Sequence, residues 1–207
     1  MLASRNQGKL REIRQVLSSC PGVHIAGLEE LDEIPEPIED GQTFAQNARK
    51  KALHYARATG QWCLADDSGL AVDALGGLPG VHSARYAADC CPPDSPRGLI
   101  DQANNQKLLE ALADVSDERR TARFVCHLVL ARTDQILIET FDAIEGRILR
   151  QPKGSNGFGY DPLFFVPEQD CTTAQLPPEM KNKVSHRGKA LRRFAELLED
   201  LLRRSKA

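Results

Sequence analysis

The segment Ser4-Arg5-Asn6-Gln7-Gly8-Lys9 combines hydroxyl, amide and ammonium donors with the expected start of a helix after Asn6. The free N–H groups and the positive dipole end of a helix N-terminus favour an anion, and Ser4, Asn6 and Lys9 add donors on the same side. The spacing of a Walker loop is absent, because Leu10 follows Lys9. The segment predicts a phosphate-binding loop; a capped helix with a surface lysine is the alternative.

Two adjacent carboxylates, Asp66 and Asp67, precede Ser68 and Gly69. Mg²⁺ in enzymes takes one or two carboxylates, and substrate phosphates and water complete its coordination. Adjacent residues at a strand end point to opposite faces, so we expect one aspartate in a site and the other in a structural contact. An Asp-rich turn without a metal is the alternative.

A glycine-rich segment extends from Gly154 to Asp161 and carries the aromatic residues Phe158 and Tyr160. Its glycines allow the backbone to approach a ligand closely, and the flat rings can stack on a nucleobase. The full dinucleotide-binding fingerprint is absent. A tight turn with packed aromatic side chains is the alternative.

Basic residues are concentrated near the C-terminus. The stretch from 181 to 193 contains no acidic residue and these bases: Lys181, Lys183, Arg187, Lys189, Arg192 and Arg193. In a chain of formal net charge −2 such a concentration favours an anionic ligand, although a solvated helix face would have the same composition. His186 and Arg187, at the expected start of a helix, could read the edge of a purine, because arginine forms bidentate hydrogen bonds.

The elements that must position these groups follow from periodicity and capping. Helices are expected after Asn6 (apolar stripe Leu10, Ile13, Val16 and Leu17), over Thr43–Thr59 with Thr43 and Gln46 as a capping box, over Leu99–Leu112, and after Ser185 (stripe Leu191, Phe194, Leu198, Leu201 and Leu202). Strands are expected over Val23–Leu28, Trp62–Ala65, Leu70–Val72, Ala122–Arg132, Gln135–Arg150 and Leu163–Val166. This order predicts an α/β fold with a mixed sheet.

Composition restricts the class of protein. A chain of 207 residues fits one domain, and with 41% hydrophobic and 27% charged residues it is globular in composition. The balanced charge disfavours a nucleic-acid-coating protein, and no apolar run approaches the roughly 18 residues of a membrane span. The six cysteines lack metal-ligand spacing, and residues 29–40 form an acidic segment expected to be a solvated loop. We therefore expect a cytoplasmic protein without a nucleic-acid or membrane partner.

A set of short motifs recurs in a defined order along the whole chain. They are S-x-N-x-x-K from residue 4, G-x-T-F at 41–44, A-D-D-S-G-L at 65–70, G-G-x-P-G at 76–80, S-A-R-Y at 83–86, G-F-G-Y-D-P at 157–162 and S-H-R-G at 185–188. This ordered set resembles the inosine triphosphate pyrophosphatase family, whose members are also called XTP/dITP pyrophosphatases.

The resemblance implies an Mg²⁺-dependent hydrolase that converts dITP, ITP or XTP to the monophosphate and pyrophosphate. It further implies a homodimer and a single domain over residues 1–207. In that domain an elongated mixed sheet, flanked by helices, forms two lobes around a central active-site cleft. A purine nucleoside triphosphate is the expected small-molecule partner.

The resemblance also assigns roles to residues of this sequence. It implies catalytic roles for Asp67, Lys9 and Lys51, with Asp67 as metal ligand and proton acceptor and with the Phe158 ring on the purine. The substrate-binding set that it implies is Ser4, Arg5, Asn6, Gln7, Gly8, Lys9, Ser68, Phe158, Gly159, Tyr160, Asp161, Lys181, His186 and Arg187.

Two positions depart from the family pattern. Only three residues precede Ser4, so the first strand is very short or the true start lies upstream. Gln46 stands where the family carries a metal-binding glutamate, so Gln46 is the expected second ligand, with Asp66 or Glu39 as the other sources of charge. A nucleotide-binding regulator without turnover and a pyrophosphatase for other modified nucleotides are the alternative functions.

Overall fold

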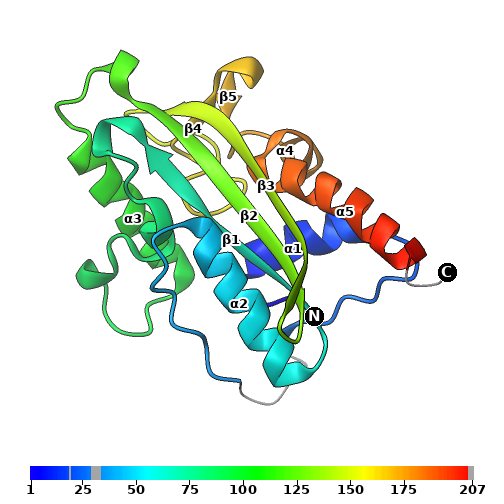
Figure 1. Cartoon of the computed structure of the whole chain (residues 1–207). Helices are drawn as coiled ribbons and strands as arrows, with labels where there is room; N and C mark the ends of the chain where they lie inside the picture. Colours follow the sequence, from blue (N-terminus) through cyan, green and yellow to red (C-terminus); the bar gives the residue numbers. More distant parts are fainter. Residues whose placement is uncertain (19, 29–33, 205–207) are drawn as a thin grey trace. The chain divides into compact units, whose positions relative to one another are not determined.

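The computed structural model describes residues 1–18, 20–28 and 34–204. Its helices are α1 (Gln7–Leu17), α2 (Phe44–Thr59), α3 (Arg97–Ala111), α4 (Pro178–Val184) and α5 (His186–Arg204), and its strands are β1 (Trp62–Val72), β2 (Thr121–Arg132), β3 (Gln135–Ile148), β4 (Phe164–Val166) and β5 (Cys171–Thr172). The strands form one sheet in the order β1-β2-β3-β4-β5, and β4 is antiparallel to both of its neighbours (Figure 1). Helices with a sheet confirm the predicted α/β class.

The chain divides into two compact units, which we call unit 1 and unit 2. Unit 1 comprises Met1–Asp67, Cys126–Asp142 and His186–Ala207, and unit 2 comprises Ser68–Val125 and Ala143–Ser185. The boundaries fall inside β1, β2 and β3, so each of these strands contributes residues to both units.

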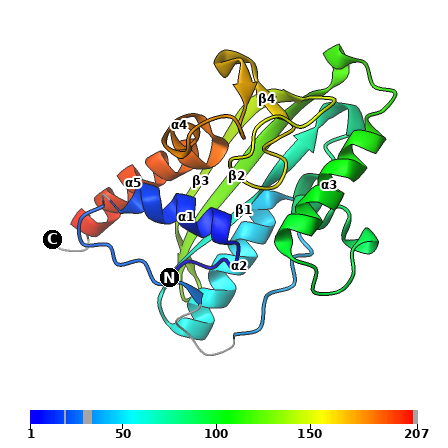
Figure 2. The same cartoon turned by 180° about the vertical axis from the view of Figure 1, so that it is seen from behind.

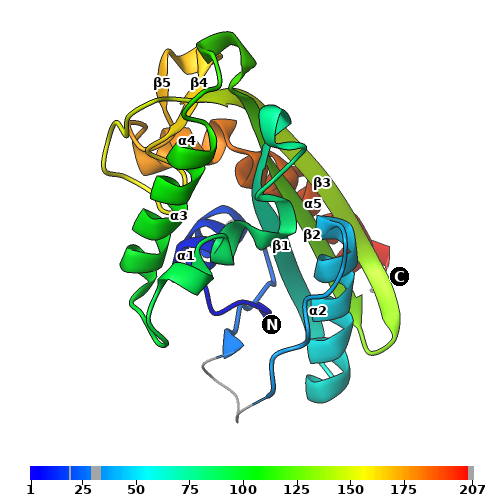
Figure 3. The ribbon, with the colours of Figure 1, turned by 90° about the vertical axis from the view of Figure 1, so that its left-hand side faces the viewer.

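In unit 1 both faces of the strands are covered. Leu64 of β1 and Leu128 of β2 pack in one apolar cluster with buried residues of α1 and α5, which lie side by side (Figure 2). Ala65 and Val129, of the opposite parity, pack in a second cluster with the alanines of α2 (Figure 3). Alternation along each strand therefore places neighbouring residues against different helices, as the apolar residues on both faces of residues 122–132 predicted.

Local capping fixes where the helices of unit 1 begin. Asn6 is the N-cap of α1, and its Oδ1 accepts from the Lys9 N–H at 3.1 Å. Thr43 caps α2 by accepting from Gln46 N–H at 3.2 Å, while Gln46 Oε1 accepts from Gln42 N–H at 2.8 Å. The predicted capping box is thus confirmed, with the reciprocal bond reaching Gln42.

The core of unit 2 lies between α3 and the strands. Leu108 and Leu112 are fully buried against residues of β1, β2 and β3. The buried Arg120 donates to the carbonyls of Leu112 (2.6 Å) and Ile148 (2.9 Å), so it ties the end of α3 to the end of β3. The bond to Leu112 O satisfies a carbonyl that the helix end leaves without a partner.

Two strand predictions are wrong. Trp62–Val72 is one continuous strand, so Asp66-Asp67-Ser68-Gly69 is not a turn. Ser83 approaches this strand closely: its Oγ accepts from Leu70 N–H at 2.9 Å, and a Cβ at Gly69 would lie 2.3 Å from that Oγ. The segment predicted as a strand from Val23 to Leu28 forms only an isolated bridge at Gly27.

The N-terminal residues add parallel pairing to the sheet. Leu2 forms parallel bridges with Leu64 and Gly27, and the Ala3 N–H donates to Leu64 O at 2.8 Å. This parallel pairing makes the sheet mixed, as predicted. The segment before Ser4 forms isolated bridges at Leu2 rather than a strand. Of the predicted acidic loop, residues 29–33 lie outside the described residues.

The remaining helices agree with the sequence, apart from α4, which periodicity did not reveal. The helix predicted over Leu99–Leu112 is α3, and α5 follows Ser185 with Leu191, Phe194 and Leu198 buried. All six cysteines are free. Among the residues that the structure describes, no helix has the length and apolar content to cross a membrane.

Candidate active site

The first charged cluster of unit 1 is centred on Asp66, whose side chain is fully buried. Its Oδ1 lies 2.6 Å from Lys9 Nζ, and its Oδ2 lies 2.7 Å from Arg187 Nε. Arg187 Nη1 is in turn 2.5 Å from Glu12 Oε2. The cluster therefore joins α1, β1 and α5 with two acidic and two basic groups.

The electrostatics of Asp66 follow from these partners. Burial, the largest single effect, would raise its pKa, but Arg187 and Lys9 together hold the pKa of Asp66 well below its usual range. Burial would likewise lower the pKa of Arg187, and Asp66 and Glu12 instead raise it. The carboxylate of Asp66 stays ionised and fully engaged. The Cys126 thiol also donates to Asp66 Oδ2 at 3.4 Å, and burial raises the pKa of that thiol.

Asp67 faces the opposite side of β1, where α2 lies. Its Oδ1 accepts from Lys51 Nζ at 2.8 Å, and Lys51 Nζ is also 3.4 Å from Glu39 Oε1. The Asp67 Oδ2 atom is buried and has no hydrogen-bond partner among residues 1–18, 20–28 and 34–204. The structure thus confirms the expectation that the two aspartates point to opposite faces, and it leaves one oxygen of Asp67 available.

The pKa values around Asp67 reflect burial first and the neighbouring charges second. Burial raises the pKa of Asp67, Lys51 opposes that rise, and Glu39 adds to it. Burial would lower the pKa of Lys51, but the charges of Asp67 and Glu39 outweigh burial and raise it. Lys51 is therefore firmly protonated, whereas Asp67 takes up a proton more readily than an exposed aspartate.

The two lysines assigned to catalysis are brought together. Lys51 Nζ donates to the Asp66 carbonyl oxygen at 3.0 Å, and Lys9 Nζ reaches the same oxygen at 3.5 Å. One ammonium comes from α1 and the other from α2, so both helices deliver positive charge to the same peptide of β1. Ser4 lies in the loop that precedes α1, and its Oγ accepts from Asn6 N–H at 3.2 Å.

The remaining residues of the predicted phosphate loop are more exposed. Arg5 Nε forms an ion pair of 3.1 Å with Glu36 Oε1, and both side chains are more than half exposed. Gln7 is exposed and Gly8 is half-buried, at the start of α1.

Gln46 occupies a different environment from Asp67. It is exposed, and its amide oxygen already serves the capping box of α2. Glu39 instead approaches Lys51, and Gly41, two residues further on, is anchored by its N–H to Asn47 Oδ1 at 2.8 Å. The metal-binding role of Gln46 stays a prediction, and Glu39 is the carboxylate that the geometry places beside Asp67 and Lys51.

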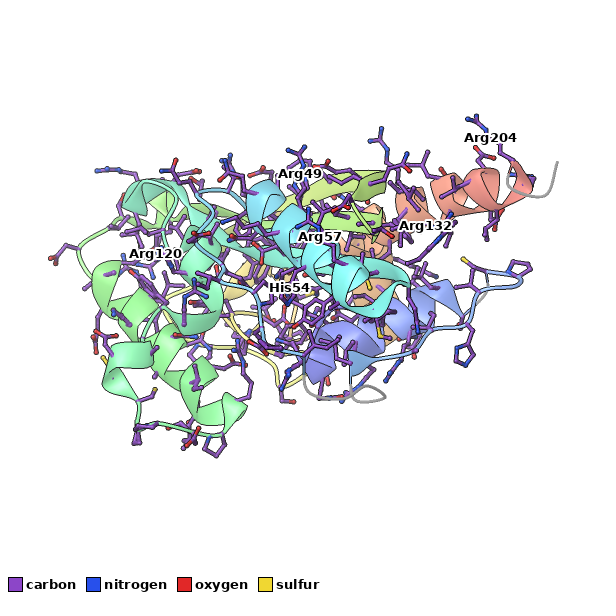
Figure 4. All side chains as sticks on the ribbon, turned by 60° about the horizontal axis from the view of Figure 1, so that its bottom comes forward. Arg49, His54, Arg57, Arg120, Arg132 and Arg204 are labelled. Carbon is purple, nitrogen blue, oxygen red and sulfur yellow. The ribbon has the colours of Figure 1, made fainter. Side chains whose placement is uncertain are left out.

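On the exposed side of α2, polar contacts connect the helix to other segments of unit 1. His54 Nε2 is 2.7 Å from Pro35 O, and Arg49 pairs with Glu139 of β3 at 2.9 Å. Figure 4 labels Arg49 and His54 along the helix. The contact to Pro35 holds the segment that carries Glu39 against α2.

In unit 2 the predicted base-binding residues gather around Asp161. Asp161 Oδ2 accepts from Phe158 N–H at 2.8 Å and from Lys181 Nζ at 2.6 Å, and its Oδ1 accepts from Thr173 Oγ1 at 2.8 Å. Lys181 Nζ lies 4.8 Å from the centre of the Phe158 ring. Asp161 is 3% exposed, so its role here is to hold the loop and Lys181 rather than to meet a ligand in solvent.

Tyr160 and Ser68 complete the predicted residues of unit 2. Tyr160 is buried in the core, and its hydroxyl donates to Ser83 O at 3.0 Å. Burial raises the pKa of Tyr160, so it stays neutral. Ser68 is half-buried in β1. His186, assigned to the base pocket by resemblance, is buried at the start of α5 in unit 1.

The comparison with known families settles the relationship. The model of the Ham1 family matches residues 1–197. The chain belongs to the Ham1 family. It is 48% identical over 201 residues to a dITP/XTP pyrophosphatase of Desulforamulus reducens, with 97% of this chain and 96% of the relative covered. It is 50% identical to a dITP/XTP pyrophosphatase of Pseudomonas aeruginosa, with 92% of each chain covered.

Solved structures of the Ham1 family share the fold. A HAM1 protein from Coxiella burnetii superposes with a TM-score of 0.83 at 40% identity, covering 96% of this chain and 97% of the other. The Ham1 protein of Staphylococcus aureus gives a TM-score of 0.81 at 39% identity, with the same coverage.

Sequence reasoning missed several residues of these clusters in this Ham1-family chain. Glu12 binds Arg187 from α1, and Thr173 binds Asp161. Asp101 and Asn105 of α3 hold Gly159. Asp101, Asn105 and Thr173 lie outside the motifs, and Glu12 is one of several charged residues of α1, so no local signal distinguishes them from surface residues.

The donors around Asp67 fit a hard cation that the substrate helps to bind. The free Asp67 Oδ2 and the carboxylate of Glu39 are oxygen ligands of the kind that Mg²⁺ prefers. No cluster of three or more His, Cys, Asp or Glu side chains suited to a metal occurs within the described ranges. Protein ligands alone would leave such an ion with open positions, which phosphate oxygens and water fill in nucleotide enzymes.

Proposed function

We propose that this chain is a pyrophosphatase that hydrolyses dITP, ITP and XTP to the nucleoside monophosphate and pyrophosphate, and so removes non-standard purines from the nucleotide pool. The names of its relatives support the reaction and the substrates. The observation that carries the proposal is the Asp67 carboxylate, with one oxygen on Lys51 and the other buried without a partner.

The chemistry assigned to Asp67 is proton transfer at Oδ2. Attack of water on the α-phosphorus requires an oriented water and an acceptor for its proton, and a carboxylate whose pKa is raised by burial is a stronger base than an exposed one. Lys51, bonded to Oδ1, fixes the rotation of the carboxylate so that Oδ2 faces away from it.

Lys51 and Lys9 supply the positive charge that a triphosphate requires. Their ammonium groups meet at the Asp66 carbonyl, Lys9 also pairs with the Asp66 carboxylate, and the charges of Asp67 and Glu39 raise the pKa of Lys51. Their charges stabilise negative charge that develops on the pyrophosphate leaving group. The ion pairs of Arg187 with Asp66 and Glu12 connect β1 to α1, the helix that carries Lys9.

We further propose Mg²⁺ as the cofactor, with Asp67 and Glu39 as its protein ligands. When bound, Mg²⁺ would supply positive charge to the phosphate oxygens and lower the pKa of a coordinated water. The support is the pair of carboxylates near Lys51 and the unpartnered Oδ2. We also propose a homodimer, which the resemblance implies, and a cytoplasmic location, which the composition favours. Light scattering of the purified protein tests the assembly.

A substrate panel tests the proposed function. The protein is incubated with Mg²⁺ and each of dITP, XTP, dUTP, GTP and ATP, and initial rates are compared. We expect kcat/KM for dITP and XTP to exceed that for ATP by about 10²-fold or more, because buried groups that bond a 6-oxo purine lose partners against a 6-amino group. Binding of dITP without hydrolysis would identify a regulator instead, and preference for dUTP would identify a pyrimidine-specific relative.

A further inference from the structure

Helix α3 holds the backbone of Gly159 at both of its polar groups. Asp101 Oδ2 accepts from the Gly159 N–H at 2.9 Å, and Asn105 Nδ2 donates to Gly159 O at 3.0 Å. The two side chains are four residues apart, so they lie on one face of α3. Figure 3 shows the loop between β3 and β4 beside this helix. All of these residues belong to unit 2.

The clamp on Gly159 completes the fixation of Phe158. The Phe158 N–H donates to Asp161 Oδ2 at 2.8 Å, and Phe158 O accepts from Asp161 N–H at 3.3 Å. With Asp101 and Asn105 on Gly159, every backbone polar group of residues 158 and 159 is bonded. Gly159 has φ +62°. Glycine adopts positive and negative φ about equally easily, so hydrogen bonds are needed to hold it in this conformation.

We propose that Asp101 and Asn105 are positioning residues that hold Phe158 in the orientation in which its ring stacks on the purine base. The inference rests on the proposed function, and it assigns to α3 a role that the motifs of the sequence do not contain. A half-buried aromatic ring binds a flat base more tightly when its backbone is already ordered, because binding then costs less conformational entropy.

Asp101 has a second partner, and the test must separate the two. Arg97 Nε lies 2.9 Å from Asp101 Oδ1, an ion pair within α3. Asp101→Ala removes both contacts, whereas Asp101→Asn keeps an oxygen that can accept from Gly159 N–H and loses the charge. Arg97→Gln removes the ion pair and the hydrogen bond from Arg97 Nη1 to Ala84 O (3.1 Å), and it leaves Asp101 Oδ2 on the Gly159 N–H.

We expect Asp101→Ala and Asn105→Ala to raise KM for dITP roughly five- to tenfold with little change in kcat, as loss of uniform binding does. Asp101→Asn and Arg97→Gln should retain a KM close to that of the original protein. Gln106→Ala is the matched control, because Gln106 is the exposed neighbour of Asn105 on α3 and bonds only Glu110 in the described contacts. An equal rise of KM in Asp101→Asn and Asp101→Ala would overturn the clamp, since charge and not the acceptor would then matter.

Hydrogen exchange supplies a readout that needs no turnover. In the nucleotide-free protein the Gly159 amide should exchange at least about tenfold faster in Asp101→Ala than in Asp101→Asn, because its acceptor is lost. Exchange of the α2 amides in unit 1 should be the same in both variants. Unchanged exchange at Gly159 would overturn the proposal even if KM rises. If the original protein hydrolyses none of the nucleotides, the proposed function fails, while the exchange result still decides whether Asp101 holds the loop.

Discussion

Asp66 and Asp67 are consecutive residues of β1, yet their carboxylates bind different cations on opposite faces of the strand. Asp66 is enclosed by Lys9 and Arg187, whereas Asp67 bonds Lys51 through one oxygen and has a second, buried oxygen without a partner in the described residues. Asp66 therefore has a structural role in ion pairs, whereas the neighbouring Asp67 has an oxygen available for chemistry.

Asp67→Asn is expected to lower kcat on dITP by about 10²- to 10⁴-fold, the contribution of a lost general base. Its free energy of unfolding should fall less than that of Asp66→Asn, because burial raises the pKa of Asp67 and Lys51 keeps Glu39 as a second carboxylate. Initial rates and urea denaturation of the same preparation check both parts. Turnover within tenfold of the original would remove Asp67 from the proposed chemistry.

Asp66→Asn is expected to act mainly on stability. Removal of one partner from a buried ion pair costs roughly 3–5 kcal/mol in the free energy of unfolding; here Lys9 loses its paired carboxylate and Arg187 keeps only Glu12. The kcat of the protein that stays folded should fall less than in Asp67→Asn. Equal catalytic loss in the two folded variants would contradict the division of roles.

The stability that Asp66 contributes should depend on pH. Its folded pKa is lowered by Arg187 and Lys9, so the contribution is complete above the unfolded pKa of about 3.9 and is lost as pH falls through the lower folded pKa. The difference in unfolding free energy between the original protein and Asp66→Asn should be constant from about pH 5 to pH 7 and shrink below about pH 4. A difference that grows as pH falls would have the wrong sign for a paired carboxylate.

A titration of Mg²⁺ at saturating dITP distinguishes Glu39 from Gln46. Glu39→Gln should raise the Mg²⁺ concentration for half-maximal rate several-fold, since it removes a negative charge near Asp67. Gln46→Glu should leave the midpoint unchanged, because residue 46 is exposed and its side chain serves the capping box. The reverse pattern would assign the second ligand to position 46.

Gly157→Ala should disrupt the loop that carries Phe158. Gly157 has φ +78°, and a Cβ there would lie 2.0 Å from Asp161 Oδ2 and 3.0 Å from Lys181 Nζ. We expect KM for dITP to rise by roughly tenfold or more as Asp161 leaves Phe158 N–H.

Gly76→Ala is the matched control for this substitution. Gly76 has φ +61° with open space around its Cβ position, so it carries only the backbone cost of about 1–2 kcal/mol. Urea denaturation measures that cost, and the KM of Gly76→Ala for dITP should stay unchanged. Similar KM values in the two variants would show that the contact with Asp161 does not matter.

Local sequence patterns predicted the elements that are determined by residues close together in the chain. The apolar spacing in residues 10–17 gave the buried face of α1, and Thr43 with Gln46 gave the start of α2. Alternation in residues 122–132 indicated a strand covered on both faces. Each of these depends on side chains within a few residues of one another.

The errors arose where distant residues decide the structure. Asp66 to Gly69 has the composition of a turn, and Ser83, 13 residues after Leu70, bonds that strand from outside. The strand predicted from Val23 to Leu28 lacks a long pairing partner and forms one bridge at Gly27. In the site, Glu39 and the clamp on Gly159 depend on contacts between separate segments, which a single sequence does not display.

Water should attack the α-phosphorus, and the position of an oxygen isotope in the products distinguishes this attack from attack on the β- or γ-phosphorus. The protein hydrolyses dITP in H₂¹⁸O with Mg²⁺, and the products are weighed by mass spectrometry. The account predicts dIMP that carries one ¹⁸O together with unlabelled pyrophosphate. Label in pyrophosphate with unlabelled dIMP would place the attack on the β-phosphorus, and dIDP with labelled orthophosphate would place it on the γ-phosphorus; either result would contradict the account.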